Sequence, residues 1–198
     1  MSWSNIPNAA LSGVVLAGGK STRMGTDKAV MLYRNQSLAD HAVHKLALFC
    51  KHVYISVNEE NVRTIDNPVP KITDTHRGEG PVTGILSSIK AIQSDILVIA
   101  CDMPLITEED ISNLIDNWDK EAAATMYFHD DTGLYEPLLA IWNYAFLDTL
   151  QSFYDKGFRS LQSFARQHHV HKIKPLHRAR FANINENKDW VWLLDNNP

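Results

Sequence analysis

The side chains with the clearest capacity for chemistry lie in one glycine-rich segment near the start of the chain, which reads LAGGKSTRMGTDK from residue 16 to residue 28. The adjacent glycines Gly18 and Gly19 leave backbone N–H groups open to an anion, because no side chain obstructs its approach. Three basic residues follow at Lys20, Arg23 and Lys28, and together they can neutralise a triphosphate. The segment therefore predicts a phosphate-binding loop, with a solvated turn that carries scattered charges as the alternative.

Two familiar phosphate-binding motifs do not fit this segment. The P-loop, G-x-x-x-x-G-K-[ST], finds its end in Gly19-Lys20-Ser21, but its first glycine would have to stand where the chain has Val14. The dinucleotide-binding G-x-G-x-x-G also fails, because Gly18 and Gly19 are adjacent. A phosphate site here must therefore follow another pattern.

The carboxylate of Asp102 is the candidate ligand for a metal ion. Residues 96–100 form a continuous apolar run, which is typical of a buried strand, and Asp102 follows closely after it. Mg²⁺ prefers hard oxygen ligands, commonly one or two carboxylates together with phosphate oxygens and water. The alternative role for this residue is to start a turn or helix before Pro104, and the strand context favours the metal role.

An alternation of strands and helices must position these candidates. Apolar and β-branched runs predict strands at residues 13–17, 53–57, 96–100, 122–128 and 137–142. Apolar stripes at helical spacing predict helices at residues 37–50, 80–92, 107–118, 144–154 and 159–167. This order predicts the α/β class, as a three-layer α-β-α arrangement with a mostly parallel sheet. Ligands bind such sheets at the carboxyl ends of the strands, so the loops after Ala17, Val57 and Ala100 should form the site.

The composition excludes several classes of protein. The 198 residues include 19 basic and 23 acidic side chains, a net charge of −4, which argues against a protein that binds nucleic acid through its phosphates. Hydrophobic residues make up 44% of the chain, too many for a disordered protein. The two cysteines, Cys50 and Cys101, have neither the number nor the spacing for a disulfide framework or a zinc site.

The sequence also carries no sign of a membrane association. No apolar run approaches the roughly 18 residues of a membrane-spanning helix, and the first ten or so residues do not resemble a signal peptide. We therefore predict a cytoplasmic protein with no membrane partner. No repeat or linker interrupts the sequence, so we predict a single domain over residues 1–198.

Five segments, in order along the chain, resemble the motifs of one enzyme family. They are the glycine-rich segment, Gly80-Pro81-x-x-Gly84, Cys101-Asp102-x-Pro104, Glu136-Pro137-Leu138-Leu139-Ala140 and Phe181-Ala182-Asn183-Ile184-Asn185. The family is that of the molybdenum cofactor guanylyltransferases, which are nucleotidyltransferases of the sugar-nucleotide type. The resemblance implies a Rossmann-like nucleotidyltransferase fold. It further implies a nucleotide-binding half at about residues 10–105 and a cofactor-binding half at about residues 106–198.

The resemblance also implies a reaction. In it, GMP passes from GTP to the molybdopterin cofactor, which yields the guanine dinucleotide cofactor and pyrophosphate in the presence of Mg²⁺, with Mn²⁺ as a substitute. It implies contact with other proteins of cofactor biosynthesis or with molybdoenzymes that accept the product. Alternatives remain open: a cytidylyltransferase for the same cofactor, a sugar-phosphate nucleotidyltransferase, or a non-catalytic nucleotide-binding module.

The roles of individual residues on the nucleotide side follow from their match to the motifs. Lys28 and Arg23 would hold the phosphates, and with Asp102 they are the implied catalytic residues. Asp102 would bind Mg²⁺ as well as the nucleotide, and Asp74 would contact the nucleotide. The remaining nucleotide contacts, largely through the backbone, would come from Leu16, Ala17, Gly18 and Gly19.

The last motif supplies the residues implied for the side of the pterin substrate. Asn183 and Asn185 offer amide donors and acceptors to a heterocycle or a phosphate. A basic stretch at residues 171–180 precedes them and either attracts the phosphate of the pterin or forms a solvated loop. One departure from the family lies after the second strand, where some relatives have an asparagine and this chain has Ser56.

Overall fold

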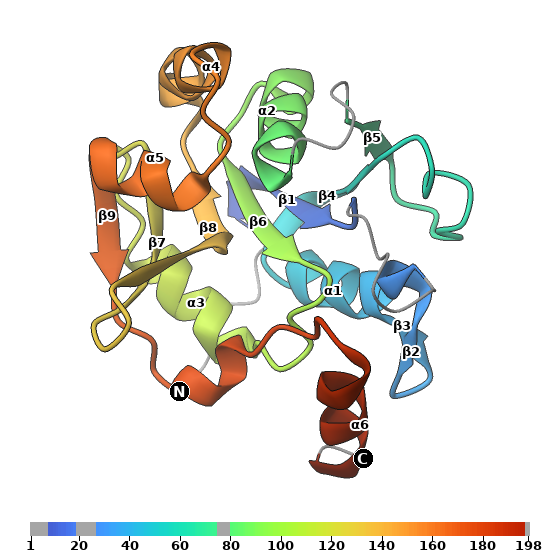
Figure 1. The fold of residues 1–198 in the computed structure, drawn as a ribbon. Coiled ribbons are helices and arrows are strands. Elements are labelled where there is room, and N and C mark those ends of the chain that lie inside the picture. The colour runs from blue at the N-terminus through green and yellow to red at the C-terminus, as the bar shows by residue number, and fades with distance from the viewer. Residues whose placement is uncertain (1–7, 19–26, 75–79, 197–198) are drawn as a thin grey trace.

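The structure is a computed structural model that describes residues 8–18, 27–74 and 80–196, without the side chains of residues 8, 9 and 196 (Figure 1). A twisted seven-stranded sheet forms its centre. From one edge to the other, the strands are β5 (Lys71–Thr73), β4 (Cys50–Val57), β1 (Asn8–Leu16), β6 (Ile96–Ala100), β8 (Leu134–Trp142), β7 (Ala124–His129) and β9 (Val170–Ile173).

The strands of this sheet run mostly parallel, as predicted. β5, β4, β1 and β6 pair in parallel, and so do β7 and β9. The strand β8 is antiparallel to both of its neighbours, β6 and β7. It follows β7 through a tight turn in which Gly133 has a φ of 67°, a conformation that glycine adopts without strain. This hairpin makes the sheet mixed on one side.

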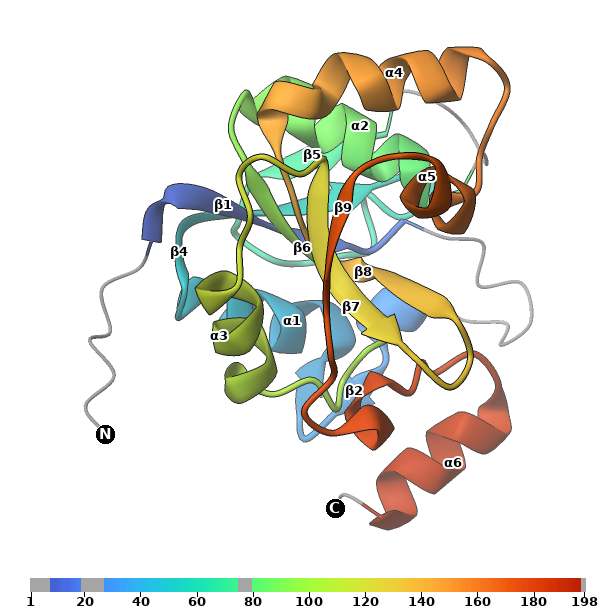
Figure 2. The ribbon, with the colours of Figure 1, turned by 90° about the vertical axis from the view of Figure 1, so that its left-hand side faces the viewer.

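Helices cover both faces of the sheet, which confirms the three-layer prediction (Figures 1 and 2). One face packs against α1 (Leu38–Ala47) and α3 (Glu108–Asp116), and the core on that side includes Leu46 and Leu114. The other face packs against α2 (Pro81–Ile92), α4 (Leu147–Asp155) and α5 (Leu161–Gln167). Two apolar cores therefore enclose the sheet, one on each face.

The local sequence explains where these helices begin. Ser37 accepts a hydrogen bond from the backbone of Asp40 at the start of α1. Thr107 and Asp110 form a capping box at the start of α3, in which each side chain bonds the other residue's backbone N–H. Pro81 occupies the first turn of α2, where its missing N–H costs nothing. The capping residues thus determine where α1, α2 and α3 begin, and the apolar stripes determine which face of each helix packs on the sheet.

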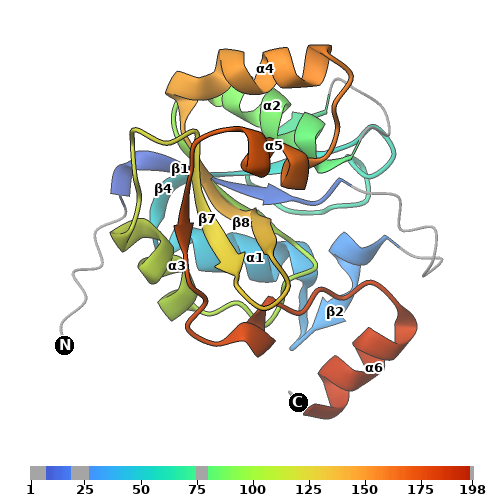
Figure 3. The same ribbon diagram turned by 60° about the vertical axis from the view of Figure 1, so that its left-hand side comes forward.

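Several short elements were not predicted. They are the edge strands β5 and β9, the hairpin of β2 (Leu32–Tyr33) and β3 (Gln36–Ser37), the 3₁₀ turns η1 (Lys28–Val30), η2 (Tyr144–Phe146) and η3 (Arg178–Phe181), and the helix α6 (Asn187–Asn196). Apart from α6, which has ten residues, these elements have two to four residues and show no periodicity that a sequence could reveal. α6 lies outside the three layers, next to β2 (Figure 3). Within the described ranges, no helix combines the length and apolar character that a membrane span requires.

Candidate functional site

The candidate site lies at the edge where the carboxyl ends of β1, β4 and β6 meet. Ala17 donates its backbone N–H to Ser56 O at 2.9 Å, and Cys101 donates to Leu16 O at 3.1 Å. These bonds bring together the loops that follow three neighbouring strands, as the parallel order predicts. Gly18 lies against the same junction, since a Cβ atom added there would contact the backbone nitrogen of Asn58 at 3.4 Å.

The loop after β4 holds the first part of the glycine-rich segment. Asn61 is buried, and its Nδ2 donates to Ala17 O at 2.5 Å. The side-chain oxygen Oδ1 of Asn61 accepts a hydrogen bond from the backbone N–H of Asn58 at 2.8 Å. Two of the predicted nucleotide-binding and catalytic residues, Gly19 and Arg23, lie outside the described residues.

Lys28, Asp102 and Asn185 converge at this edge from three distant segments. Lys28 Nζ lies 3.7 Å from Asp102 Oδ2 and donates to Asn185 Oδ1 at 3.0 Å. Lys28 opens η1, which Asp27 caps by accepting from the backbone of Ala29 at 3.1 Å. The side chains of Lys28 and Asp102 are 16% and 21% exposed, so a ligand can reach both of them.

Asp102 sits in a tight turn that two further backbone bonds fix. Met103 donates its N–H to Ala100 O at 3.2 Å, and Ile184 donates to Asp102 O at 2.9 Å. The second bond ties the late motif to the turn, with Asn183 and Asn185 on either side of the buried Ile184. The two asparagines therefore face different neighbours: Asn185 bonds Lys28, whereas Asn183 lines a cavity.

Two oxygen atoms here are buried without a hydrogen-bond partner among the described residues. They are Asp102 Oδ1 and Asn183 Oδ1. Burial raises the pKa of the Asp102 carboxyl, and the nearby charge of Lys28 opposes that rise. A buried oxygen without a hydrogen-bond partner is costly, and a bound cation would satisfy that of Asp102. The donor set therefore fits Mg²⁺, a cation that oxygen ligands hold.

Asp74 follows β5 at the same side of the sheet. Its backbone N–H donates to Val57 O at 2.7 Å. Its carboxylate accepts from the hydroxyl groups of Thr83 and Ser87, both on α2. Asp74 thus anchors the start of α2 near the carboxyl end of β4, and its contact with a nucleotide stays a prediction.

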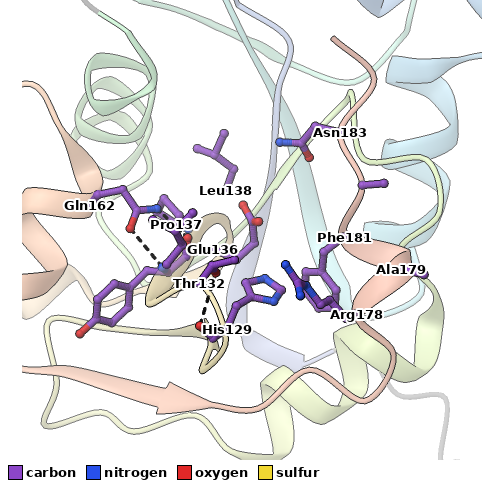
Figure 4. A pocket seen from close by; sticks show the side chains of 13 residues that line it. His129, Thr132, Glu136, Pro137, Leu138, Gln162, Arg178, Ala179, Phe181 and Asn183 are labelled. Atoms are coloured by element: carbon purple, nitrogen blue, oxygen red, sulfur yellow. Dashed lines mark hydrogen bonds between the residues drawn. The ribbon is translucent and has the colours of Figure 1, made fainter. Parts of the chain in front are cut away.

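A cavity of about 690 Å³ adjoins the Asp102 turn on the side of the β7–β8 hairpin (Figure 4). The hairpin, α5 and the segment around η3 form its walls. Its lining residues are His129, Thr132, Leu134, Tyr135, Glu136, Pro137, Leu138, Gln162, Arg178, Ala179, Phe181, Ala182 and Asn183. Figure 4 shows Glu136 between Asn183 on one side and His129 with Arg178 on the other.

Glu136 opens the fourth motif of the sequence, for which no individual role was predicted, and it lines the cavity. Burial, with a smaller contribution from the charge of Asp102, raises the pKa of its carboxyl to about 7. The strand pairing shifts register here, from Met126 opposite Ala140 to Tyr127 opposite Glu136, so β8 bulges over the intervening residues. A lone carboxylate before Pro137 in an otherwise apolar strand was the available signal.

The predicted basic stretch is largely neutralised by acidic neighbours. Lys174 pairs with Asp130 at 2.7 Å, and Arg178 pairs with Asp131. Arg180 lies 2.8 Å from a carboxylate oxygen of Glu109. The stretch is therefore neither a free cationic surface nor wholly solvated, and Arg178 is its charged member in the cavity wall.

Comparison with protein families identifies the chain. The model of the MobA-like NTP transferase domain matches residues 13–172, which span all or part of each of the seven strands of the central sheet and most of the site. This chain belongs to the MobA-like NTP transferase family. The members of this family are nucleotidyltransferases, so the class of enzyme predicted from the sequence is confirmed.

Individual MobA-like proteins resemble the chain over most of its length. A probable molybdenum cofactor guanylyltransferase from Opitutus terrae is 32% identical over 91% of this chain and 93% of its own. A molybdenum cofactor biosynthesis bifunctional protein from Synechocystis is 28% identical over 94% of this chain, which spans 54% of that protein's length. The crystal structure of a molybdopterin-guanine dinucleotide biosynthesis protein A from Archaeoglobus fulgidus shares the fold, with a TM-score of 0.75 and 22% identity over 91% of this chain and 95% of that one.

Proposed function

We propose that this MobA-like protein transfers GMP from GTP to the phosphate of molybdopterin cofactor and releases pyrophosphate. The observation that carries the proposal is the convergence of Lys28, Asp102 and Asn185 beside a cavity large enough for a second substrate. The resemblance to the Opitutus guanylyltransferase supports the choice of GTP and of the cofactor.

The transfer needs one bond to form and one to break. An oxygen of the pterin's phosphate attacks the α-phosphorus of GTP, and the bond from that phosphorus to the bridging oxygen of the β-phosphate breaks. Negative charge grows on the leaving pyrophosphate. The protein's part in such a reaction is to position the two substrates and to stabilise this charge.

Lys28 is placed to bind the phosphates of GTP. Its ammonium group already lies between a carboxylate and an amide oxygen, so it can turn to a phosphate without leaving the site. Leu16 O and both backbone polar groups of Ala17 already bond to neighbouring loops, so the contacts of Leu16, Ala17 and Gly18 with the nucleotide remain predictions, as do those of Gly19 and Arg23. The nucleotide would thus lie over the carboxyl ends of β1 and β6.

Asp102 would hold Mg²⁺ with its unpartnered oxygen Oδ1. When bound, the cation would neutralise charge on the reacting phosphates. Mn²⁺ has similar ligand preferences and would serve as a substitute.

The pterin would occupy the cavity between the β7–β8 hairpin and η3. Asn183 stands at its boundary with the Asp102 turn, so the phosphate of the pterin would enter near Asp102 and the ring would lie farther in. Arg178, whose charge Asp131 balances, and His129, whose pKa burial lowers, would meet the substrate as hydrogen-bonding groups, while Glu136 would meet ring N–H groups. Protein partners that deliver or receive the cofactor, a cytoplasmic location and a single domain stay predictions.

Turnover of α-labelled GTP with molybdopterin cofactor and Mg²⁺ tests the function. We expect labelled dinucleotide product with GTP and little with CTP, ATP or UTP. A preference for CTP would point to a cytidylyltransferase, and acceptance of a sugar phosphate would point to that class of transferase. Binding of GTP with no turnover of any acceptor would indicate the non-catalytic module.

Asp102→Asn tests the metal assignment within this reaction. The substitution keeps the shape and hydrogen-bonding capacity of the side chain but removes the charge that a dication requires. We expect activity to fall by roughly a hundredfold or more across a Mg²⁺ titration, with a melting temperature close to or above that of the wild type. A folded variant with wild-type turnover would remove Asp102 from the metal site.

A further inference from the structure

Two side chains of α1 contact the backbone of the turn that carries Asp102. Lys45 Nζ donates to Pro104 O at 2.7 Å, and His41 Nε2 lies 3.3 Å from the same oxygen. The two residues are four positions apart, so both project from one face of the helix. A single carbonyl oxygen two residues beyond Asp102 therefore receives both contacts.

Backbone bonds hold both halves of this turn, and the bond in the second half is the longest, since Ile106 donates its N–H to Met103 O at 3.4 Å. Cys101 and Met103 donate to Leu16 O and Ala100 O, and Asp102 O accepts from Ile184. Pro104 has no N–H to offer, so its carbonyl is the backbone polar group through which its neighbours can hold it. Lys45 and His41 supply that hold.

Open space surrounds these two contacts. A cavity of about 730 Å³ lies between α1 and the start of α3, and its wall includes His41, Lys45 and Pro104. Because packing does not fill this space, apolar contacts alone cannot fix the carbonyl from that side. Pro104 is buried and Met103 and Ile106 pack into the core, so the two polar contacts fix the carbonyl oxygen of a turn that packing already holds from the other side.

Burial lowers the pKa of both donors, and each can still donate a hydrogen bond near pH 7. Burial lowers the pKa of His41 to about 4, so its ring stays neutral near pH 7 and keeps one N–H donor. The ring also packs edge-on against the buried Tyr33, at 5.3 Å between centroids. Burial lowers the pKa of Lys45 to about 8, while the charges of Asp110 and Glu108 favour its ammonium form and that of Arg34 disfavours it.

We propose that Lys45 and His41 are positioning residues for the Asp102 carboxylate. By holding Pro104 O they fix the turn, which keeps Asp102 Oδ2 beside Lys28 and leaves Oδ1 available to the cation. This inference rests on the proposed metal role of Asp102, although neither Lys45 nor His41 needs to touch a substrate or the metal ion.

The test uses variants that remove one donor at a time and leave the packing in place. Lys45→Met keeps the apolar stem, and His41→Phe keeps the ring against Tyr33. The conservative variants Lys45→Arg and His41→Gln restore a donor at each position. The matched control is Lys71→Met, because Lys71 Nζ also donates to a backbone carbonyl, Ile65 O at 2.6 Å, but on the edge strand β5.

The readout is metal dependence, measured without the pterin. A fluorescent GTP analogue is titrated at a series of Mn²⁺ concentrations, which gives the concentration for half-saturation by the metal, and a melting curve is recorded for each variant. We expect the double variant Lys45→Met/His41→Phe to raise this concentration about tenfold, in line with the loss of groups that orient metal ligands. Each single variant should raise it less, because the other donor remains.

The controls distinguish positioning from simple stabilisation. Lys45→Arg and His41→Gln should respond to Mn²⁺ as the wild type does. Lys71→Met should lower the melting temperature by an amount similar to that for Lys45→Met and leave the metal response unchanged. Should the double variant not fold, the single variants carry the same comparison.

Two results would overturn the inference in distinguishable ways. If Asp102→Asn raises the Mn²⁺ requirement but Lys45→Met and His41→Phe do not, the positioning role fails and the metal role stands. If Asp102→Asn also leaves the requirement unchanged, the metal assignment fails, and the positioning role fails with it.

Discussion

Lys28 occupies the point where the nucleotide side and the late motif meet. In the structure its ammonium group contacts a carboxylate from the loop after β6 and an amide from the segment before α6. Both contacts are groups that a phosphate can replace, because phosphate oxygens accept hydrogen bonds from lysine as carboxylates do. This residue is therefore the most direct test of where the triphosphate lies.

We expect Lys28→Ala to reduce kcat/KM for GTP by roughly a hundredfold or more, since loss of one electrostatic contact to transition-state charge commonly costs about 3 kcal/mol. The fold should survive, because the side chain is at the site's surface and not in either core. Steady-state kinetics with GTP and a melting curve make the measurement. Near-normal turnover by this variant would move the triphosphate elsewhere.

The neighbouring asparagines give a second prediction at the scale of the residue. We expect Asn183→Ala and Asn185→Ala to impair use of the pterin more than binding of GTP, as the late motif implies. The effect on pterin use should be larger for Asn183, which lines the cavity, than for Asn185, which bonds Lys28. KM values for both substrates check this, and equal losses for GTP and pterin would place the pair on the nucleotide side.

At the scale of the element, close packing of α2 on the sheet places the start of that helix beside the site. Gly84 faces β1 and β4 so closely that a Cβ atom would lie 2.9 Å from Ser56 Oγ and 3.2 Å from Leu16 Cδ2. The close approach requires glycine at one position and leaves little room for a longer side chain at the other.

We therefore expect Gly84→Ala to destabilise the protein by about 1–3 kcal/mol, the usual cost of overpacking a buried site. Part of this cost would be offset by the higher helix propensity of alanine. The free energy of unfolding in urea measures the effect. Gly84→Ala combined with Ser56→Ala should recover some stability, and a Gly84→Ala protein as stable as the wild type would show that the helix can shift away from the sheet.

At the scale of the whole molecule, the mixed side of the sheet places a half-buried titratable carboxyl, that of Glu136, in the wall of the cavity. Burial and the charge of Asp102 raise the pKa of Glu136 to about 7, whereas an exposed glutamate has its ordinary value near 4.5. Between these two values the folded protein keeps a proton that the unfolded chain releases. The stabilisation from Glu136 is therefore complete below about pH 4.5 and is lost as the pH rises through about 7.

The expected result is a pH-dependent difference between the wild type and Glu136→Gln. Between pH 5 and pH 8 the variant should gain roughly 2 kcal/mol in unfolding free energy relative to the wild type, because the amide does not ionise. Comparison of the two proteins cancels the contributions of other titrating groups, such as His41 and His129. Parallel stability curves over this range would show that Glu136 titrates normally in the folded protein.

The sequence by itself determined the elements whose residues must be apolar or must cap a helix. The strand at residues 96–100 is buried on both faces of the sheet, and its continuous apolar sequence predicts a strand in the centre of a sheet. Thr107 begins α3 as its capping pattern predicts, and the loop after Ala100 delivers Asp102 to the ligand edge. The motif resemblance identified the family for the same reason, because each motif is a local pattern of residue types.

Only the tertiary structure decided which of these residues meet. The contact of Lys28 with Asn185 joins positions 157 residues apart, and no periodicity or local propensity encodes such a pairing. The antiparallel pairing of β8 and its bulge place Glu136 in the cavity wall. The packing of α1 beside the turn of Asp102 brings Lys45 into contact with Pro104 O. These contacts depend on how whole elements pack against one another. That packing is set by burial and hydrogen bonding across the entire molecule, so the sequence of a single segment does not specify it.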